Sequence, residues 1–196
     1  MMNKILIVLA FFILQTVSAQ TNEVFNYKEY RWTIVIPKGF TPVDPAEWEK
    51  MRGRGVDKVE EVYDTDLEYL IQPIETILVV KKGEQNYLEV VRQDFDPLTD
   101  GSFEESVNGV VEILIETFET SMPDAEIEHN TGKEAIGGKT FIMHNIVLTF
   151  PNQVKLVAYM YSCLIDKKEF TVNLIYTDGI TGAALIEAFK NSIFKE

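Results

Sequence analysis

The amino-acid sequence predicts an α+β protein, an α/β/α sandwich built around a central antiparallel β-sheet. Four β-type runs follow one another in the second half of the chain, with short turns between them. Short connections join antiparallel neighbours, because parallel pairing requires a long crossover. In the run at 154–165, apolar side chains fall on both faces of the strand, so we expect both faces of the sheet to be covered. Amphipathic helical segments elsewhere in the chain are the expected covering layers.

Residues 1–19 have the layout of a secretory signal peptide. Lys4 precedes an apolar run from Ile5 to Leu14, and small residues up to Ala19 offer a site for signal peptidase. The run is shorter than the ~20 apolar residues that span a membrane. We therefore expect cleavage near Ala19 and a periplasmic or secreted product. A single globular domain is expected over 20–196, with no transmembrane segment in the mature chain.

Two short β-type runs open the mature chain, at 24–27 and 31–36, and together they predict an N-terminal hairpin. The second run stops at Pro37, because proline offers no amide donor to a strand ladder. A first helix is expected after Asp44, whose side chain suits the N-cap position, with Pro45 in the first turn.

The apolar residues of this first helix fall on one side of a 3.6-residue repeat. They are Trp48, Met51, Val56, Val59, Val62 and Tyr63. Gly53 and Gly55 interrupt the pattern, each at a cost of ~1 kcal/mol relative to alanine. We expect one interrupted helix rather than two short ones.

Two further β runs, at 77–81 and 87–92, precede a second helix. This helix is expected to begin at Ser102, with Glu105 as the partner in a capping box, and to end at Met122-Pro123. Its expected buried face consists of Phe103, Val107, Val110, Val111, Leu114 and Phe118.

The second half of the chain predicts a four-stranded meander followed by a helix. The β runs lie at 126–135, 140–149, 154–165 and 169–177, and turn-forming residues separate them. A C-terminal helix is expected from about 181 to 194. Its apolar residues Leu185, Ile186, Phe189 and Ile193 are expected to cover one face of the sheet.

The composition excludes some classes of function. The formal net charge is −13, and this excess disfavours nucleic-acid binding, which depends mainly on lysine and arginine neutralising phosphates. Cys163 is the only cysteine, so no internal disulfide can form and an exported product must rely on packing. No cysteine lies near the expected cleavage site, which excludes attachment of a bacterial lipid anchor there.

Three stretches of the chain carry a family resemblance. An aromatic-rich hairpin with a proline-glycine exit spans Tyr30–Phe40, Ile136–Phe141 begins the meander, and Phe189–Phe194 closes the chain. In this order of elements the chain resembles the Mog1/PsbP-like fold group, whose members have a central antiparallel sheet between helices. It also resembles exported bacterial proteins of about this length. The resemblance covers nearly all of the mature chain.

The resemblance implies an accessory or binding protein rather than an enzyme, since known members of the fold group act in photosystem assembly or small-GTPase regulation. A shared fold does not transfer either role. The expected export also separates this chain from both settings. No functional residue is carried over from the group.

His129 and His144 are the only histidines, and antiparallel pairing of their runs brings them together. Imidazole suits transition metals, so the pair and a nearby acid form one candidate metal site. No HExxH or equivalent spacing accompanies the pair. His144 shares a strand face with Ile142, Ile146 and Leu148, which favours a hydrogen-bonded core histidine instead.

Two acidic stretches are candidate cation or partner sites. The stretch at 94–101 has the oxygen density of a calcium loop, but Leu98 occupies a position where an EF-hand has a ligand. We interpret it as a turn that leads into the second helix. The other run is interpreted as a solvated helix face, with docking of a basic partner as the alternative. Its members are Glu60, Glu61, Asp64, Asp66 and Glu68.

Cys163 lies inside a strand run, and no neighbouring cation would lower the pKa of its thiol. We expect a buried, inert thiol rather than a nucleophile activated by a histidine. The sequence contains no G-x-S-x-G elbow and no glycine loop suited to phosphates before a helix.

We therefore expect an exported, non-enzymatic binding or accessory protein with an unknown protein or small-molecule partner and no cofactor. No catalytic, cofactor-binding or metal residue is assigned. One alternative is a metal-assisted or hydrolase-like enzyme that uses His129, His144 and carboxylates. Another is a carrier of small apolar ligands in the cell envelope, which requires a cavity of roughly 300–1,000 Å³.

Overall fold

The computed structural model describes residues 23–64 and 74–195. The expected signal peptide at 1–19 lies outside the described residues, and so do Asp66 and Glu68 of the acidic run. No helix formed by the described residues is long and apolar enough to cross a membrane.

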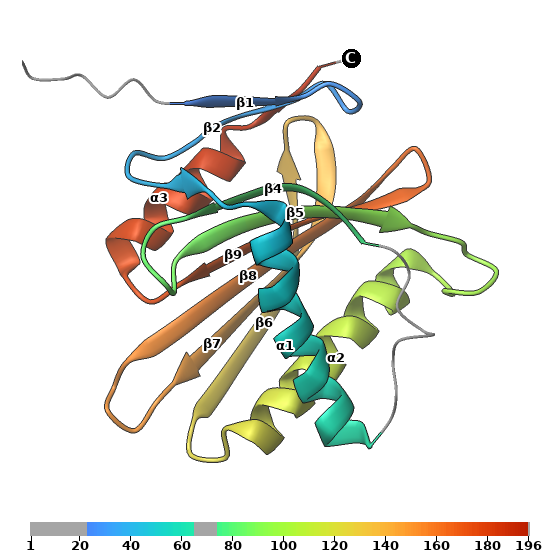
Figure 1. Ribbon diagram of the computed structural model, residues 1–196. Helices are drawn as coiled ribbons and strands as arrows, with labels where there is room; N and C mark the ends of the chain where they lie inside the picture. Colours follow the sequence, from blue (N-terminus) through green and yellow to red (C-terminus); the bar gives the residue numbers. More distant parts are fainter. Residues whose placement is uncertain (1–22, 65–73, 196) are drawn as a thin grey trace, which may run out of the picture.

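An antiparallel sheet of seven strands forms the centre of the molecule (Figure 1). Its strands lie in the order β3-β4-β5-β9-β8-β7-β6. Their bounds are β3 (Thr41–Pro42), β4 (Glu75–Lys81), β5 (Tyr87–Asp94), β6 (Glu126–Ile136), β7 (Lys139–Thr149), β8 (Lys155–Ile165) and β9 (Lys168–Tyr176). Every neighbouring pair is antiparallel, which confirms the predicted meander. Pairing of β5 with β9 adds the β4–β5 hairpin to the same sheet.

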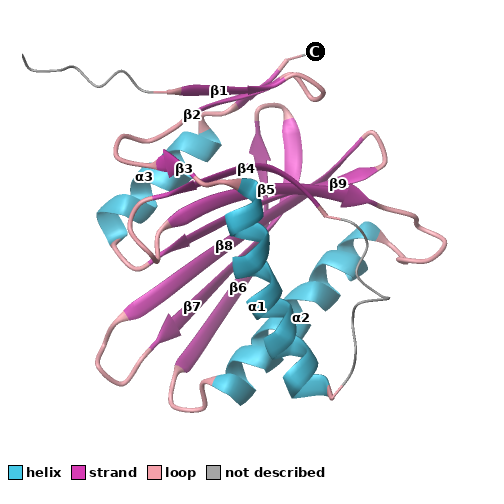
Figure 2. Cartoon of the chain, viewed as in Figure 1, coloured by secondary structure: helices cyan, strands magenta, loops and turns pink. Residues whose placement is uncertain are grey.

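Helices cover both faces of this sheet, as predicted for an α/β/α sandwich (Figure 2). The helices α1 (Pro45–Tyr63) and α2 (Phe103–Ser121) lie on one face, where Trp48 of α1 packs against Val79. The helix α3 (Gly179–Lys190) lies on the other face, and its Leu185 and Phe189 belong to the main core. A small sheet beside α3 consists of β1 (Val24–Tyr27), β2 (Trp32–Val35) and β10 (Ile193–Phe194).

Side chains cap the first two helices where the sequence predicts it. Asp44 Oδ1 accepts hydrogen bonds from the amides of Ala46 and Glu47, at 2.9 and 3.3 Å. Ser102 Oγ accepts a hydrogen bond from the Glu105 amide, and Glu105 Oε2 accepts one from the Ser102 amide. This reciprocal pair is the expected capping box. As predicted, α1 is one helix that continues through both of its glycines.

The C-terminal helix is shorter than predicted. It ends at Lys190 instead of 194, and Ile193–Phe194 form β10, which pairs with β2. Phe189 and Ile193 are four residues apart, a spacing typical of a helical stripe, and this pattern misled the sequence prediction. Ile193 is instead 53% exposed and Phe194 only 9% exposed. The strand forms because it completes the small sheet and buries its phenylalanine.

The turn between β6 and β7 requires glycine. Gly137 and Gly138 have φ values of +56° and +81°, which L side chains rarely adopt. A Cβ on Gly137 would also lie 2.8 Å from Phe194 Cδ2. The turn therefore packs closely against β10.

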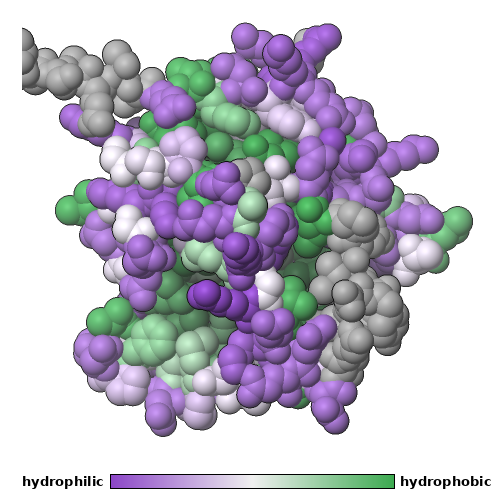
Figure 3. Space-filling model, in the orientation of Figure 1, coloured by the Kyte–Doolittle hydropathy of each residue, from purple (hydrophilic) through white to green (hydrophobic). Residues whose placement is uncertain are grey.

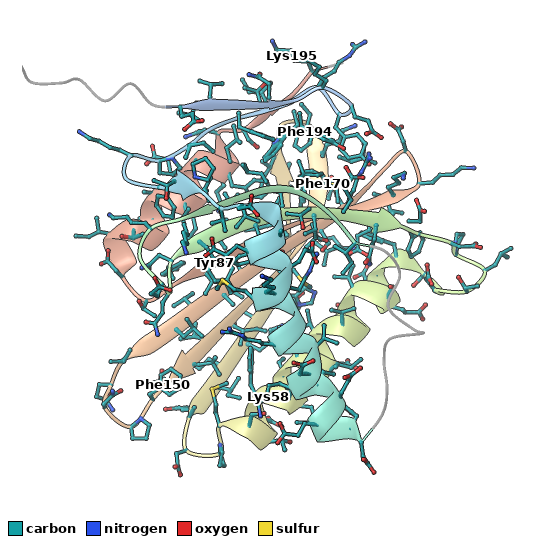
Figure 4. All side chains as sticks on the ribbon, viewed as in Figure 1. Lys58, Tyr87, Phe150, Phe170, Phe194 and Lys195 are labelled. Carbon is teal, nitrogen blue, oxygen red and sulfur yellow. The ribbon has the colours of Figure 1, made fainter. Side chains whose placement is uncertain are left out.

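An aromatic cluster joins the small sheet to the large one. The ring of Phe170 on β9 meets Trp32 of β2 and Phe194 of β10 edge-on, with centroids 5.5 and 5.6 Å apart. Figure 4 shows Phe170 and Phe194 between the two sheets. Trp32 Nε1 donates a hydrogen bond to Ser192 Oγ at 3.0 Å, so the indole is satisfied inside the core. Burial of these rings holds the small sheet in place.

The shortened helix leads to a stability prediction. Phe194→Ala is expected to lower the free energy of unfolding by about 3 kcal/mol, because it removes a buried ring. Ile193→Ala is the matched control and should change it by less than about 0.5 kcal/mol, since that side chain is exposed. Urea denaturation measures both values. A larger loss of stability for Ile193→Ala than for Phe194→Ala would indicate that the helix continues to residue 194.

Candidate functional site

The sheet face beneath α1 and α2 carries polar side chains. Phe170 and Val172 of β9 belong to the apolar core on the α3 side. Because successive side chains of a strand alternate, Glu169, Thr171 and Asn173 face α1 and α2. Glu169 and Thr171 are nevertheless 9% and 6% exposed. Polar groups buried to this degree need hydrogen-bond partners.

Glu169 obtains one partner from the neighbouring strand β5 and one from its own strand. Gln93 Nε2 of β5 donates to Glu169 Oε2 at 2.9 Å, and Thr171 Oγ1 donates to Glu169 Oε1, also at 2.9 Å. The hydroxyl groups of Thr171 and Ser162 are 2.7 Å apart, which extends the chain of hydrogen bonds to β8. Each carboxylate oxygen of Glu169 therefore accepts one hydrogen bond from the protein.

A second buried carboxylate, that of Glu89, connects the sheet to α1. Trp48 Nε1 donates to Glu89 Oε1 at 2.5 Å, and Asn173 Nδ2 donates to Glu89 Oε2 at 3.0 Å. Arg52 Nη1 lies 4.0 Å from Glu89 Oε1 and supplies a positive charge. This network fixes α1 over the sheet and orients the amide of Asn173.

A cavity of about 380 Å³ lies between the N-terminal half of α2 and this polar face. Its polar floor includes Gln93, Glu169, Thr171 and Asn173. Its apolar walls include Val91 and Met160 beside these polar groups on the sheet, Val110 on α2, and Phe95 after β5. The sequence predicts a buried Val110, but this residue is 52% exposed because it lies at the edge of the cavity rather than against the sheet.

An apolar area adjoins the polar face on the other side of α1. Figure 3 shows hydrophilic side chains over α1 and hydrophobic ones gathered beside it, over β7 and β8. Leu156 and Ala158 of β8 and Ile175 of β9 are half-buried on this face. The helix-covered face is therefore polar around Glu169 and apolar towards the β7–β8 turn.

The two histidines come together, as antiparallel pairing predicts. His129 Nε2 and His144 Nδ1 are 3.0 Å apart, in ring planes inclined by 11°. His144 is 2% exposed, and its Nε2 has no hydrogen-bond partner among the described residues. His129 is exposed. No cluster of three or more histidine, cysteine, aspartate or glutamate side chains that could hold a metal ion occurs in the part of the chain that the structure describes.

Cys163 lies on the opposite side of the sheet, in the core beneath α3. It is 3% exposed, which confirms the predicted buried thiol. Burial raises the pKa of the Cys163 thiol to about 12. The thiol is therefore protonated and a poor nucleophile near neutral pH.

The acids of the stretch at 94–101 hold a turn together. Asp96 Oδ1 accepts a hydrogen bond from the Leu98 amide at 3.0 Å, and Asp100 Oδ2 accepts one from the Asp96 amide at 2.8 Å. Leu98 is 92% exposed. The stretch is the turn that the sequence predicts before α2.

The described part of the acidic run lies at the C-terminal end of α1. Glu61 and Asp64 are exposed, and Glu61 forms an ion pair with Lys58. Glu60 is half-buried. Among the described residues, the arrangement is that of a solvated helix end.

The sequence interpretation missed the side chains that form the floor of the cavity. A signal for them exists in the run at 169–174, where polar Glu169, Thr171 and Asn173 alternate with apolar residues. Such alternation indicates a strand with one polar face. It does not indicate that a helix covers that face.

No family model matches the chain, and no curated protein matches it either. Among solved structures, the chain is similar to cyanobacterial PsbP (CyanoP) from Synechocystis sp. PCC 6803, whose structure was determined in solution. The TM-score is 0.55 and the sequence identity 11%, over 92% of this chain and 96% of that chain. At this identity the likeness shows the fold alone, and that fold is PsbP-like, as the sequence resemblance implies.

The buried histidine predicts a pH dependence of stability. Burial, with a smaller contribution from the charge of His129, lowers the pKa of His144 below its ordinary value of 6.5. His144 therefore takes up its proton at a lower pH in the folded state than in the unfolded chain, where protonation occurs as the pH falls through 6.5. The free energy of unfolding should consequently fall between about pH 7.5 and pH 5.

Urea denaturation across this pH range tests the assignment. His144→Gln should flatten the dependence, because it removes the titrating group. His129→Gln is the control and should keep most of the dependence, since burial of His144 is the main cause of its shift. If the free energy of unfolding of His144→Gln changes with pH as steeply as that of the wild type, other groups cause the dependence.

Proposed function

We propose that this protein is an exported, non-enzymatic binding protein that takes a small organic molecule into the cavity between α2 and the sheet. The cavity is the observation that carries the proposal, since about 380 Å³ is within the usual range for small-molecule sites. Apolar walls with a few convergent polar groups are the usual composition of such a site.

The placement of the reactive side chains supports binding rather than catalysis. Cys163 is buried on the other face of the sheet. Neither His129 nor His144 belongs to the described residues that line the cavity. The described lining offers hydrogen bonds and apolar contact, but neither an imidazole nor a thiol.

Two other functions each have one observation in their favour. The contact between His129 and His144 supports the metal-assisted or hydrolase-like enzyme. The apolar walls of the cavity support a carrier of small apolar ligands. A purely apolar ligand would leave the Glu169 carboxylate with neither water nor a polar partner on the cavity side, which is costly. The mixed lining therefore favours a ligand that is partly polar.

Export is part of the proposal and rests on the layout of residues 1–19. Expression of the full chain in a bacterial host should give a product in the periplasm or the medium that begins at Gln20. Intact-mass analysis and N-terminal sequencing of the purified product check this outcome. A product that stays in the cytosol and keeps its first residues would contradict export.

Obstruction of the cavity tests the binding function. Val110→Trp places a large ring at the edge of the cavity and should weaken fragment binding by at least ~10-fold. Ile113→Trp is the matched control, because Ile113 is also exposed on α2 but does not line the cavity. Ligand-observed NMR with a set of small aromatic and aliphatic fragments gives the measurement.

The comparison between the two tryptophan variants decides the result. Selective loss of fragment binding in Val110→Trp supports the cavity as the binding site. Equal binding in both variants and the wild type would place the function elsewhere on the molecule.

A further inference from the structure

We infer that the ligand is a small amine with an apolar body, and that Glu169 is the counter-ion of its ammonium group. This inference rests on the proposed binding function and specifies the chemistry of the same cavity.

The Glu169 carboxylate is buried, and it has no ion-pair partner in the part of the chain that the structure describes. It is 9% exposed, and it accepts hydrogen bonds from the neutral donors Gln93 and Thr171. No basic side chain of the described residues forms a salt bridge with it. A buried charge is costly unless it is paired, so a cation in the cavity would offset this cost.

The floor of the cavity also has unused acceptor positions. An ionised carboxylate has about four lone-pair sites, and the protein occupies one on each oxygen of Glu169. An ammonium group carries only donors. It is therefore complementary to the unused lone pairs of the Glu169 carboxylate.

The surroundings do not offer a positive charge for an anionic ligand. Arg92 is the only basic residue in the described lining of the cavity. Its guanidinium contacts the carboxylates of Glu29 and Glu75 and lies over the rings of Tyr27 and Tyr30. Two acids and two aromatic rings thus already engage the charge of Arg92.

The walls define the rest of the ligand. Val91, Phe95, Val110 and Met160 give the cavity an apolar lining. These walls suit an aliphatic or aromatic body attached to the ammonium group. A polyamine or a sugar would leave this surface without apolar contact. The combination of walls and floor therefore selects an amphipathic monoamine.

The test compares amines with neutral molecules of the same shape. Phenethylamine and hexylamine are the probes, and 2-phenylethanol and 1-hexanol are their neutral counterparts. Ligand-observed NMR titrations with the mature wild-type protein should give an affinity about 10-fold higher for each amine than for its alcohol, because hydrogen bonds to charged groups are stronger.

Two variants assign the preference to one side chain. Glu169→Gln keeps the shape of the side chain and should remove the preference for amines. Glu112→Gln makes the same change in charge on an exposed part of α2 and should keep the preference. Circular dichroism and the unfolding temperature verify that both variants fold, and the comparison of probes on the wild type requires no variant.

The outcomes separate this inference from the proposed function. Equal binding of amines and alcohols, abolished by Val110→Trp, would overturn the amine inference and keep the binding cavity. Amine preference that survives in a folded Glu169→Gln variant would also overturn it. Binding of none of the four probes would contradict both the amine inference and the cavity.

Discussion

The contact of the Phe170 ring with the small sheet is the interaction on which the rest of the structure depends. This ring meets Trp32, Phe141 and Phe194, so it joins strands from both ends of the chain to the centre of the large sheet. Because side chains alternate along a strand, the position of Phe170 sends its neighbour Glu169 to the opposite face. A slip of one residue in β9 would expose the aromatic ring and place a carboxylate in the apolar core. The register that builds the core therefore also builds the floor of the cavity.

The two faces of the large sheet bury different kinds of side chain. Beneath α3, the rings of Phe141, Phe170 and Phe189 pack together and leave little need for polar partners. Beneath α1 and α2, the sheet buries carboxylates, and neutral donors from the sheet and from α1 stabilise them. Hydrogen bonds of this kind replace those to water but do not neutralise the charge of Glu169. An uncompensated charge beside a cavity is a reason for ligand binding, whereas a filled apolar core is a reason for stability alone.

The likeness to cyanobacterial PsbP concerns the arrangement of strands and helices, at 11% sequence identity. Function depends on the side chains placed on a fold, and most side chains differ between the two proteins at this identity. In the sequence, the histidines, the cysteine and the acidic stretches are the candidate sites, because these residue types often bind metals or act in catalysis. In the folded chain, the cysteine lies in the core and the acids of the 94–101 stretch close a turn. The strongest candidate site consists instead of ordinary polar residues that only a covering helix turns into a cavity.

The sequence by itself determined the local features of this protein. The caps at Asp44 and Ser102, the hairpin turns and the antiparallel meander depend on hydrogen bonds between residues close in the chain, which short patterns specify. It also contained the alternation that puts Glu169 and Thr171 on one face. Only the tertiary structure decided that β5 pairs with β9, that the last residues form a strand on β2, and that α2 stands over the polar face. These choices depend on which surfaces can be buried together across the whole chain, and no local pattern contains that information.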